Sequence, residues 1–222
     1  MASITKTPTA PYNPFFGCGI IASAALVFGG IIAWSLYSLT TQDREIAKFT
    51  VEQPVKPVPV KVMGPELEAL KQRLTTFGQE VKAARPARLV LTVAELNTLT
   101  DLAPDTGYGN FAEIIAFKSA TEGKELVADV CFPMNKMKFW EDKRYAVGEA
   151  TFGTVIVNET GPDIKLHSLT VPGKVVNPGF VDTFSSLSLL APYHKLEALA
   201  PIMKAIKSVK VTSKGVELST TP

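Results

Sequence analysis

The sequence is poor in the residues that usually carry chemistry. Among 222 residues it has two cysteines and two histidines. Cys131 is the one cysteine downstream of residue 42, so no disulfide can form within that part of the chain. His167 and His194 have no carboxylates at ligand spacing beside them, which argues against a zinc site. We therefore expect no metal and no other cofactor.

Charge is also missing, from one long stretch near the N-terminus. No charged residue occurs between Pro8 and Gln42, and residues 15–39 are almost wholly apolar. A helix rises about 1.5 Å per residue and a bilayer core is about 30 Å thick, so roughly 20 apolar residues suffice to cross it. The run predicts a transmembrane helix over 15–39, preceded by an N-terminal tail over 1–14.

The apolar run is too long for an ordinary signal peptide. Ala22-Ser23-Ala24 offers the small residues of a cleavage site, but the apolar residues continue to Leu39. We therefore expect an uncleaved anchor and a single-pass membrane protein. Three small residues at a four-residue spacing share one face of this helix and form a candidate helix–helix contact: Ala25, Gly29 and Ala33. The ordinary composition of membrane helices explains these residues equally well.

The rest of the chain is balanced in charge. Beyond residue 42 it has 22 basic and 21 acidic residues, which gives no electrostatic reason to expect a nucleic-acid partner. Residues 40–64 contain Pro54, Pro57 and Pro59, which fix φ and favour an extended, stiff segment. We interpret 40–64 as a linker that spaces a domain from the membrane; a ligand for a proline-recognition groove is the alternative.

Residues 65–220 are long enough for one hydrophobic core. Apolar residues recur at three- and four-residue steps in some segments and alternate in others, which predicts an α+β domain with a mostly antiparallel sheet packed by helices. The expected helices cover 65–84, 95–102 and two or three short segments within 178–207; the expected strands cover 87–91, 111–119, 125–132, 144–158, 164–171, 208–212 and 216–219. Thr92 with Glu95 fits a capping box that opens the second helix, and Gly123 suits a turn with positive φ between strands 111–119 and 125–132.

Candidate catalytic groups are few. Glu113 and Asp129 can face one another across the hairpin of strands 111–119 and 125–132, where solvated edge carboxylates are the simpler interpretation. Cys131 lies in an expected strand, which favours a small buried residue over a nucleophile. We expect a protein that is not an enzyme.

Residues 132–144 combine apolar and aromatic side chains with cations, which suits a lipid headgroup interface. The alternative is a connection whose apolar residues cover the core while its lysines are solvated. The candidate membrane-contact residues are Met134, Lys136, Met137, Lys138, Phe139 and Trp140.

The expected helices of 178–207 carry apolar faces that pack on the sheet. Either these faces fill the core, or they line a slot for lipid. The candidate groove residues are Phe180, Phe184, Leu187 and Met203.

Short motifs resemble those of YpmS-like single-pass bacterial envelope proteins. They are Leu91–Asn97 after a short strand, the strand Arg144–Glu149, and Leu169–Lys174 followed by Asn177-Pro178. With the closing hairpin they span about residues 87–220. The resemblance implies a domain outside the cytoplasm, anchored by the N-terminal helix. By looser analogy with tubular lipid-binding domains, it also implies a sheet-and-helix groove for acyl chains.

Together these patterns predict a membrane-anchored, non-enzymatic envelope domain that binds a lipid or protein partner. The expected partners are membrane lipid and, through the anchor helix, other membrane proteins or a second copy. A structural accessory subunit of a larger membrane assembly is the first alternative, and a hydrolase with an unrecognised catalytic group is the second.

Overall fold

The computed structural model describes residues 14–103, 111–123, 125–134, 144–153 and 156–221. The chain forms two units, residues 1–45 and residues 46–222. The first contains most of helix α1 (Pro14–Phe49), whose Cys18–Phe49 portion is long and apolar enough to cross a membrane, with a mean hydropathy of 2.0 over its most apolar window. The described part of the chain thus has one N-terminal apolar helix, which fits a single-pass anchor or a signal sequence.

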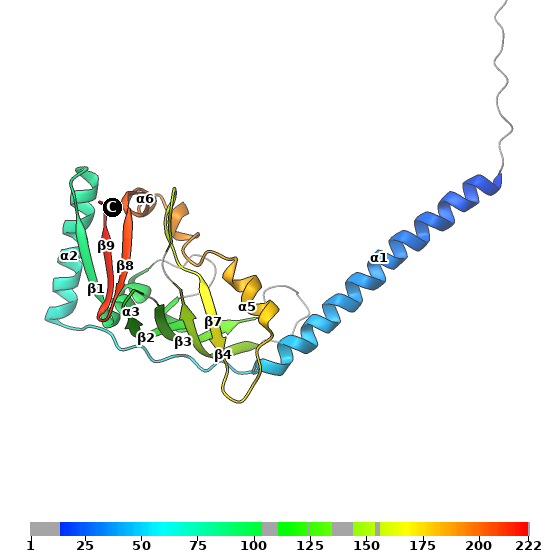
Figure 1. Ribbon diagram of the computed structural model, residues 1–222, viewed down its shortest axis with the longest axis horizontal. Coiled ribbons are helices and arrows are strands. Elements are labelled where there is room, and N and C mark those ends of the chain that lie inside the picture. Colours follow the sequence, from blue (N-terminus) through cyan, green and yellow to red (C-terminus); the bar gives the residue numbers. More distant parts are fainter. Residues whose placement is uncertain (1–13, 104–110, 124, 135–143, 154–155, 222) are drawn as a thin grey trace, which may run out of the picture. The chain divides into compact units, whose positions relative to one another are not determined.

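The second unit is an α+β domain, as the sequence predicted (Figure 1). Its strands form a sheet in the order β1-β9-β8, a sheet in the order β2-β3-β4-β7, and a hairpin of β5 with β6, all antiparallel. The strands are β1 (Arg88–Thr92), β2 (Ile115–Thr121), β3 (Glu125–Pro133), β4 (Tyr145–Phe152), β5 (Ile156–Asn158), β6 (Gly161–Asp163), β7 (Leu166–Thr170), β8 (Ser208–Thr212) and β9 (Gly215–Ser219).

Local sequence signals explain where the helices begin. Pro65 occupies the first turn of its helix, and Thr92 and Glu95 form the capping box that the sequence predicted. The side chain of Asn177 accepts a hydrogen bond from the Gly179 N–H at the start of another. These elements are α2 (Pro65–Lys82), α3 (Val93–Leu102), α4 (Phe111–Ile114), α5 (Pro178–Ser185), the 3₁₀ turn η1 (Tyr193–Lys195) and α6 (Ala200–Ala205).

Two expected strands were wrong in extent. Residues 111–114 form α4 instead of the start of a strand, and their three-residue spacing lets Phe111 and Ile114 both pack on the core. The expected strand 144–158 divides into β4 and β5, because β4 pairs with β3 and β7 while β5 pairs only with β6 in a separate hairpin. The turn between β2 and β3 is as expected, with Gly123 at φ 68°.

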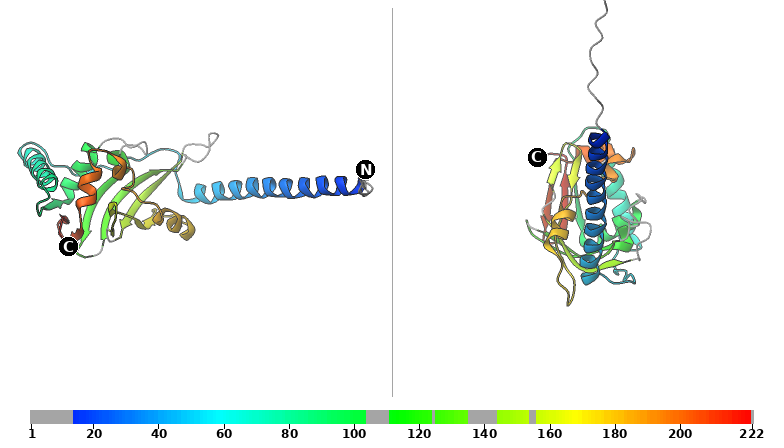
Figure 2. Two further views of the ribbon diagram at one scale, coloured as in Figure 1. Left: turned by 90° about the horizontal axis from the view of Figure 1, so that it is seen from above. Right: turned by 90° about the vertical axis from the view of Figure 1, so that its right-hand side faces the viewer.

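Two apolar clusters hold the domain together. The larger lies on the inner face of the four-stranded sheet, where small residues such as Ala128 and Ala150 are fully buried and leave room for rings from α5. The smaller joins α2 and α6 to β1 through residues such as Leu70, Phe77 and Leu89; Figure 2 gives further views of this arrangement.

Helix α3 covers the edges of both sheets. Its Glu95 carboxylate accepts from the Thr92 N–H at 2.8 Å, and Arg73, which pairs with Glu95, donates to the Val90 carbonyl at 2.8 Å on the edge of β1. At the edge of β2, the fully buried side chain of Asn97 pairs with both main-chain groups of Phe117: Oδ1 accepts from the N–H at 2.8 Å, and Nδ2 donates to the carbonyl at 2.9 Å. Such pairing satisfies edge groups that would otherwise accept a foreign strand.

Candidate functional site

The most informative region is the junction where the chain enters the folded unit. The last turn of α1 belongs to that unit, and Phe49 is only 1% exposed, with its ring centroid 5.0 Å from that of Phe180. Lys174 donates from Nζ to the Thr50 carbonyl at 2.8 Å. A cation at the C-terminus of a helix satisfies a free carbonyl and interacts favourably with the helix dipole. The junction is therefore a fixed part of the domain.

Two of the four candidate groove residues meet at this junction. Phe180 and Phe184 lie with centroids 4.5 Å apart, and both pack against the larger core cluster. Leu187 is 50% exposed, and Met203 lies in α6, where its main chain contacts Gly161 of β6. The structure therefore brings the two phenylalanines together, half-buried against the core, and leaves Leu187 and Met203 elsewhere.

The candidate membrane-contact residues are described only at one end. Met134 is half-buried against the core, and its N–H donates to the Arg144 carbonyl at 2.9 Å. Lys136, Met137, Lys138, Phe139 and Trp140 lie outside the described residues.

Residues 50–63, here called the Pro-rich strap, lie along the domain. The strap begins with an antiparallel bridge in which Val51 and Tyr145 exchange hydrogen bonds of 2.9 and 2.8 Å. Further on, the Val60 carbonyl accepts from Asn97 Nδ2 at 3.0 Å. Ion pairs also hold it: Lys56 with Glu113 at 2.8 Å and Lys61 with Asp101 at 3.0 Å.

These contacts differ from the interpretation of this segment as a free spacer. The strap passes along the four-stranded sheet toward α2 (Figure 1). Its prolines keep the backbone extended without a neighbouring strand, and side chains and one bridge supply the partners that a strand would supply. The sequence predicted the extended conformation but not the docking.

The strap also determines the surroundings of Cys131. This thiol is 3% exposed, and burial raises its pKa, although a hydrogen bond from the backbone of Val55 and the charge of Lys56 oppose the rise. A buried neutral thiol is a poor nucleophile. Cys131 therefore behaves as the small buried residue that its strand position indicated.

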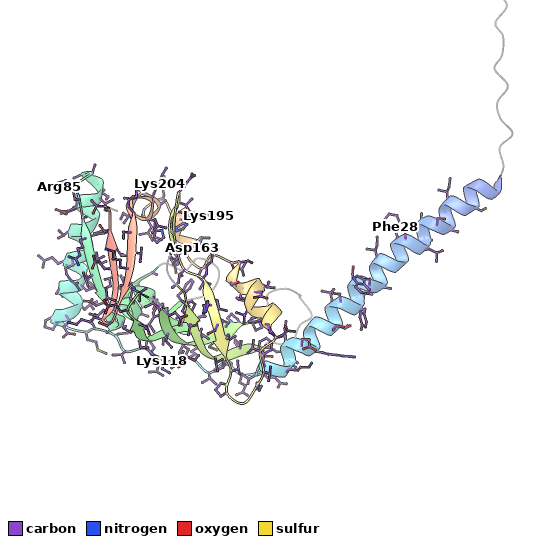
Figure 3. All side chains as sticks on the ribbon, viewed as in Figure 1. Phe28, Arg85, Lys118, Asp163, Lys195 and Lys204 are labelled. Atoms are coloured by element: carbon purple, nitrogen blue, oxygen red, sulfur yellow. The ribbon has the colours of Figure 1, made fainter. Side chains whose placement is uncertain are left out.

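The two carboxylates proposed to face one another have separate partners. Register pairs Asp129 with Ala116, and Glu113 lies in α4 with Lys56. On the exposed face of the sheet, Lys118 (Figure 3) contacts both Asp129 and Glu149, and their hydrogen bonds raise the pKa of its ammonium group. The trio has one cation and two carboxylates, so one negative charge remains, and Lys118 holds Asp129 away from any pairing with Glu113.

The histidines are bound to structural neighbours. His194 Nε2 lies 2.9 Å from the Pro162 carbonyl and Nδ1 lies 3.2 Å from the Thr160 hydroxyl, while Ser188 donates separately to buried Asp163 at 2.5 Å. Among the described residues, the ring nitrogens of His194 contact Pro162 and Thr160 and make no hydrogen bond to Ser188 or Asp163. Within the described residues, no three or more His, Cys, Asp or Glu side chains gather as a metal site.

Two open hollows flank the strap. One of about 410 Å³ lies between Val58 and Val60 of the strap, the start of α3, and β2. The other, of about 500 Å³, lies at the junction and is lined by Thr50, Val51, Glu52, Gln53, Val55 and Arg144. Neither is lined by the candidate groove residues.

The candidate helix–helix residues Ala25, Gly29 and Ala33 are all exposed on α1. A Cβ added at Gly29 would meet nothing within 4 Å. This face of α1 is therefore exposed in the isolated chain, which agrees both with a helix–helix contact and with ordinary membrane-helix composition.

No family model, curated protein or solved structure matches this chain. Sequence reasoning did not single out Phe49 or Glu52, and it named Asn97 and Arg144 only as members of short motifs. The sequence did contain one indication for Phe49: it is an aromatic residue that follows polar residues and lies outside the apolar run. The other positions depend on contacts between distant segments.

Proposed function

We propose that this protein is a single-pass membrane protein whose α+β domain binds a lipid or protein partner at the cell envelope without catalysing a reaction. The observation that carries the proposal is the junction: the apolar helix continues into the domain, and its last turn is part of the domain core. A domain built around the end of an apolar helix is suited to work at a membrane surface.

Chain length limits how far the junction can lie from the bilayer. The apolar run ends at Leu39 and α1 remains helical to Phe49, so the axial length between them is about 15 Å. The headgroup layer on each side of a bilayer occupies roughly 5–8 Å of that length. The junction therefore lies within about 10 Å of the headgroup layer when an anchored helix is upright, and closer when the helix tilts.

An extracytoplasmic position of the domain rests on the resemblance to YpmS-like envelope proteins. The near-equal numbers of Lys and Arg beside the two ends of the apolar run do not set the orientation. A protease that cannot cross the cell membrane should digest the domain in spheroplasts if it faces outward. Protection in intact spheroplasts, with digestion after lysis, would reverse this assignment.

Anchoring itself has a separate test. We expect the full-length protein to stay in the membrane fraction after carbonate extraction, and its intact mass to retain the N-terminal residues. A protein that begins near Ala24 or Leu39 and is released into the soluble fraction would show that the apolar helix is a signal sequence.

A structural subunit of a larger membrane assembly is the second candidate. The exposed face of Ala25, Gly29 and Ala33 favours it, because small residues at this spacing allow close helix packing in lipid. Gly29→Ile should abolish co-purification of partner polypeptides in mild detergent if this face is the contact, whereas Gly19→Ile provides a matched control on the same helix.

A further inference from the structure

The hollow at the junction contains two opposite charges on neighbouring chain segments. Because Val51 bridges Tyr145 in antiparallel register, the next residue on one segment and the preceding residue on the other are neighbours across the bridge. These residues are Glu52 and Arg144, and both line the hollow of about 500 Å³. That volume lies within the usual range of small-molecule sites.

Neither charge has an ion-pair partner within the part of the chain that the structure describes. By contrast, the two cations of the strap are paired, Lys56 with Glu113 and Lys61 with Asp101. No pair within 4.0 Å joins Glu52 to Arg144, although their positions are adjacent. Among the residues that the structure describes, the hollow is thus lined by one positive and one negative group, each able to accept a partner of opposite sign.

We propose that this hollow binds the headgroup of a zwitterionic membrane phospholipid such as phosphatidylethanolamine. Arg144 pairs with the phosphate and Glu52 pairs with the ammonium group. The guanidinium presents several N–H donors to phosphate oxygens, and the ammonium donates to the carboxylate. This inference rests on the proposed membrane anchoring.

The position of the hollow favours a lipid over a soluble zwitterion. Thr50 and Val51 line it, directly after the end of α1, and about 15 Å of helix separates that end from the apolar run. Val55, 61% exposed, lies on the same hollow and offers an apolar contact beside the charges. Glu52 disfavours a purely anionic headgroup, because it would repel a second negative charge.

The test uses the full-length protein in maltoside detergent, with phosphatidylethanolamine or phosphatidylglycerol added at equal concentration. Native mass spectrometry measures how much of each lipid the protein retains. The variants are Arg144→Gln and Glu52→Gln. The matched controls are Glu80→Gln in α2 and Arg85→Gln just beyond it (Arg85 is labelled in Figure 3), whose side chains pair at 3.6 Å outside the hollow. Circular dichroism confirms that each variant is folded.

We expect Arg144→Gln to lower retention of both lipids by about 3- to 10-fold, as for loss of a charged contact that solvent partly screens. Glu52→Gln should lower retention of phosphatidylethanolamine but not of phosphatidylglycerol, and the controls should match the unaltered protein. Equal retention by Arg144→Gln and the controls, or an unchanged lipid preference in Glu52→Gln, overturns the headgroup site. Carbonate extraction of the same protein reports on anchoring independently, so the site can fail while the anchor stands.

Discussion

Replacing Asn97 with alanine should destabilise the domain more than any single exposed polar substitution. The Asn97 side chain is 0% exposed and makes three hydrogen bonds: to the N–H and carbonyl of Phe117 and to the carbonyl of Val60. Asn97→Ala leaves these three main-chain groups without a partner. A buried polar group left unsatisfied costs about 1–3 kcal/mol, and relaxation admits some water, so we expect a loss of about 3–5 kcal/mol.

Urea denaturation of residues 46–222, followed by far-ultraviolet circular dichroism, measures this loss. The matched control is Asn158→Ala, because Asn158 is exposed and its Oδ1 accepts from Thr160 and Gly161 within one turn. We expect the control to lose less than about 1 kcal/mol. If the two variants lie within 1 kcal/mol of each other, the argument from Asn97 is wrong.

Asn97→Asp separates the hydrogen bonds from the space that the side chain fills. The aspartate keeps an acceptor for the Phe117 N–H, but when ionised it has no proton for the carbonyls of Phe117 and Val60. Burial favours the neutral acid, so the variant should regain stability as the pH falls and lose it as the pH rises. A stability independent of pH between about 4 and 8 would contradict this account.

The remaining predictions concern the junction, the thiol and the closing hairpin. Phe49→Ala should lower the free energy of unfolding by about 3–4 kcal/mol in the same urea assay, because it removes the contact with Phe180. A fragment of residues 65–222 lacks the same contact, so it should be less stable than residues 46–222. Burial raises the pKa of Cys131, so stability should fall as the pH rises above the ordinary thiol range, and Cys131→Ala should remove that fall. Gly215→Ala should abolish folding of the β8–β9 hairpin, because φ is 151° and an added Cβ would collide with the Leu91 carbonyl. Hydrogen exchange of the hairpin amides measures this effect, and normal protection of those amides in the variant would refute the prediction.

Local pattern was enough to predict much of the fold. The apolar run, the capping box at Thr92 and the turn at Gly123 each depend on residues within a few positions of one another, so the sequence predicted them correctly. The alternation of apolar residues likewise predicted the α+β class. Where two elements share one pattern, as in 111–119, the period alone could not separate helix from strand.

The sequence by itself determined that the chain has an N-terminal apolar helix followed by an antiparallel α+β domain. Only the tertiary structure decided that the strap docks on the sheet, that Phe49 joins the core and that Glu52 and Arg144 line the same hollow. Asn97 and Val60 are 37 positions apart, and Lys174 and Thr50 are 124 apart. Local periodicity carries no information about such pairs, because each depends on how whole elements pack and which main-chain groups the packing leaves without a partner.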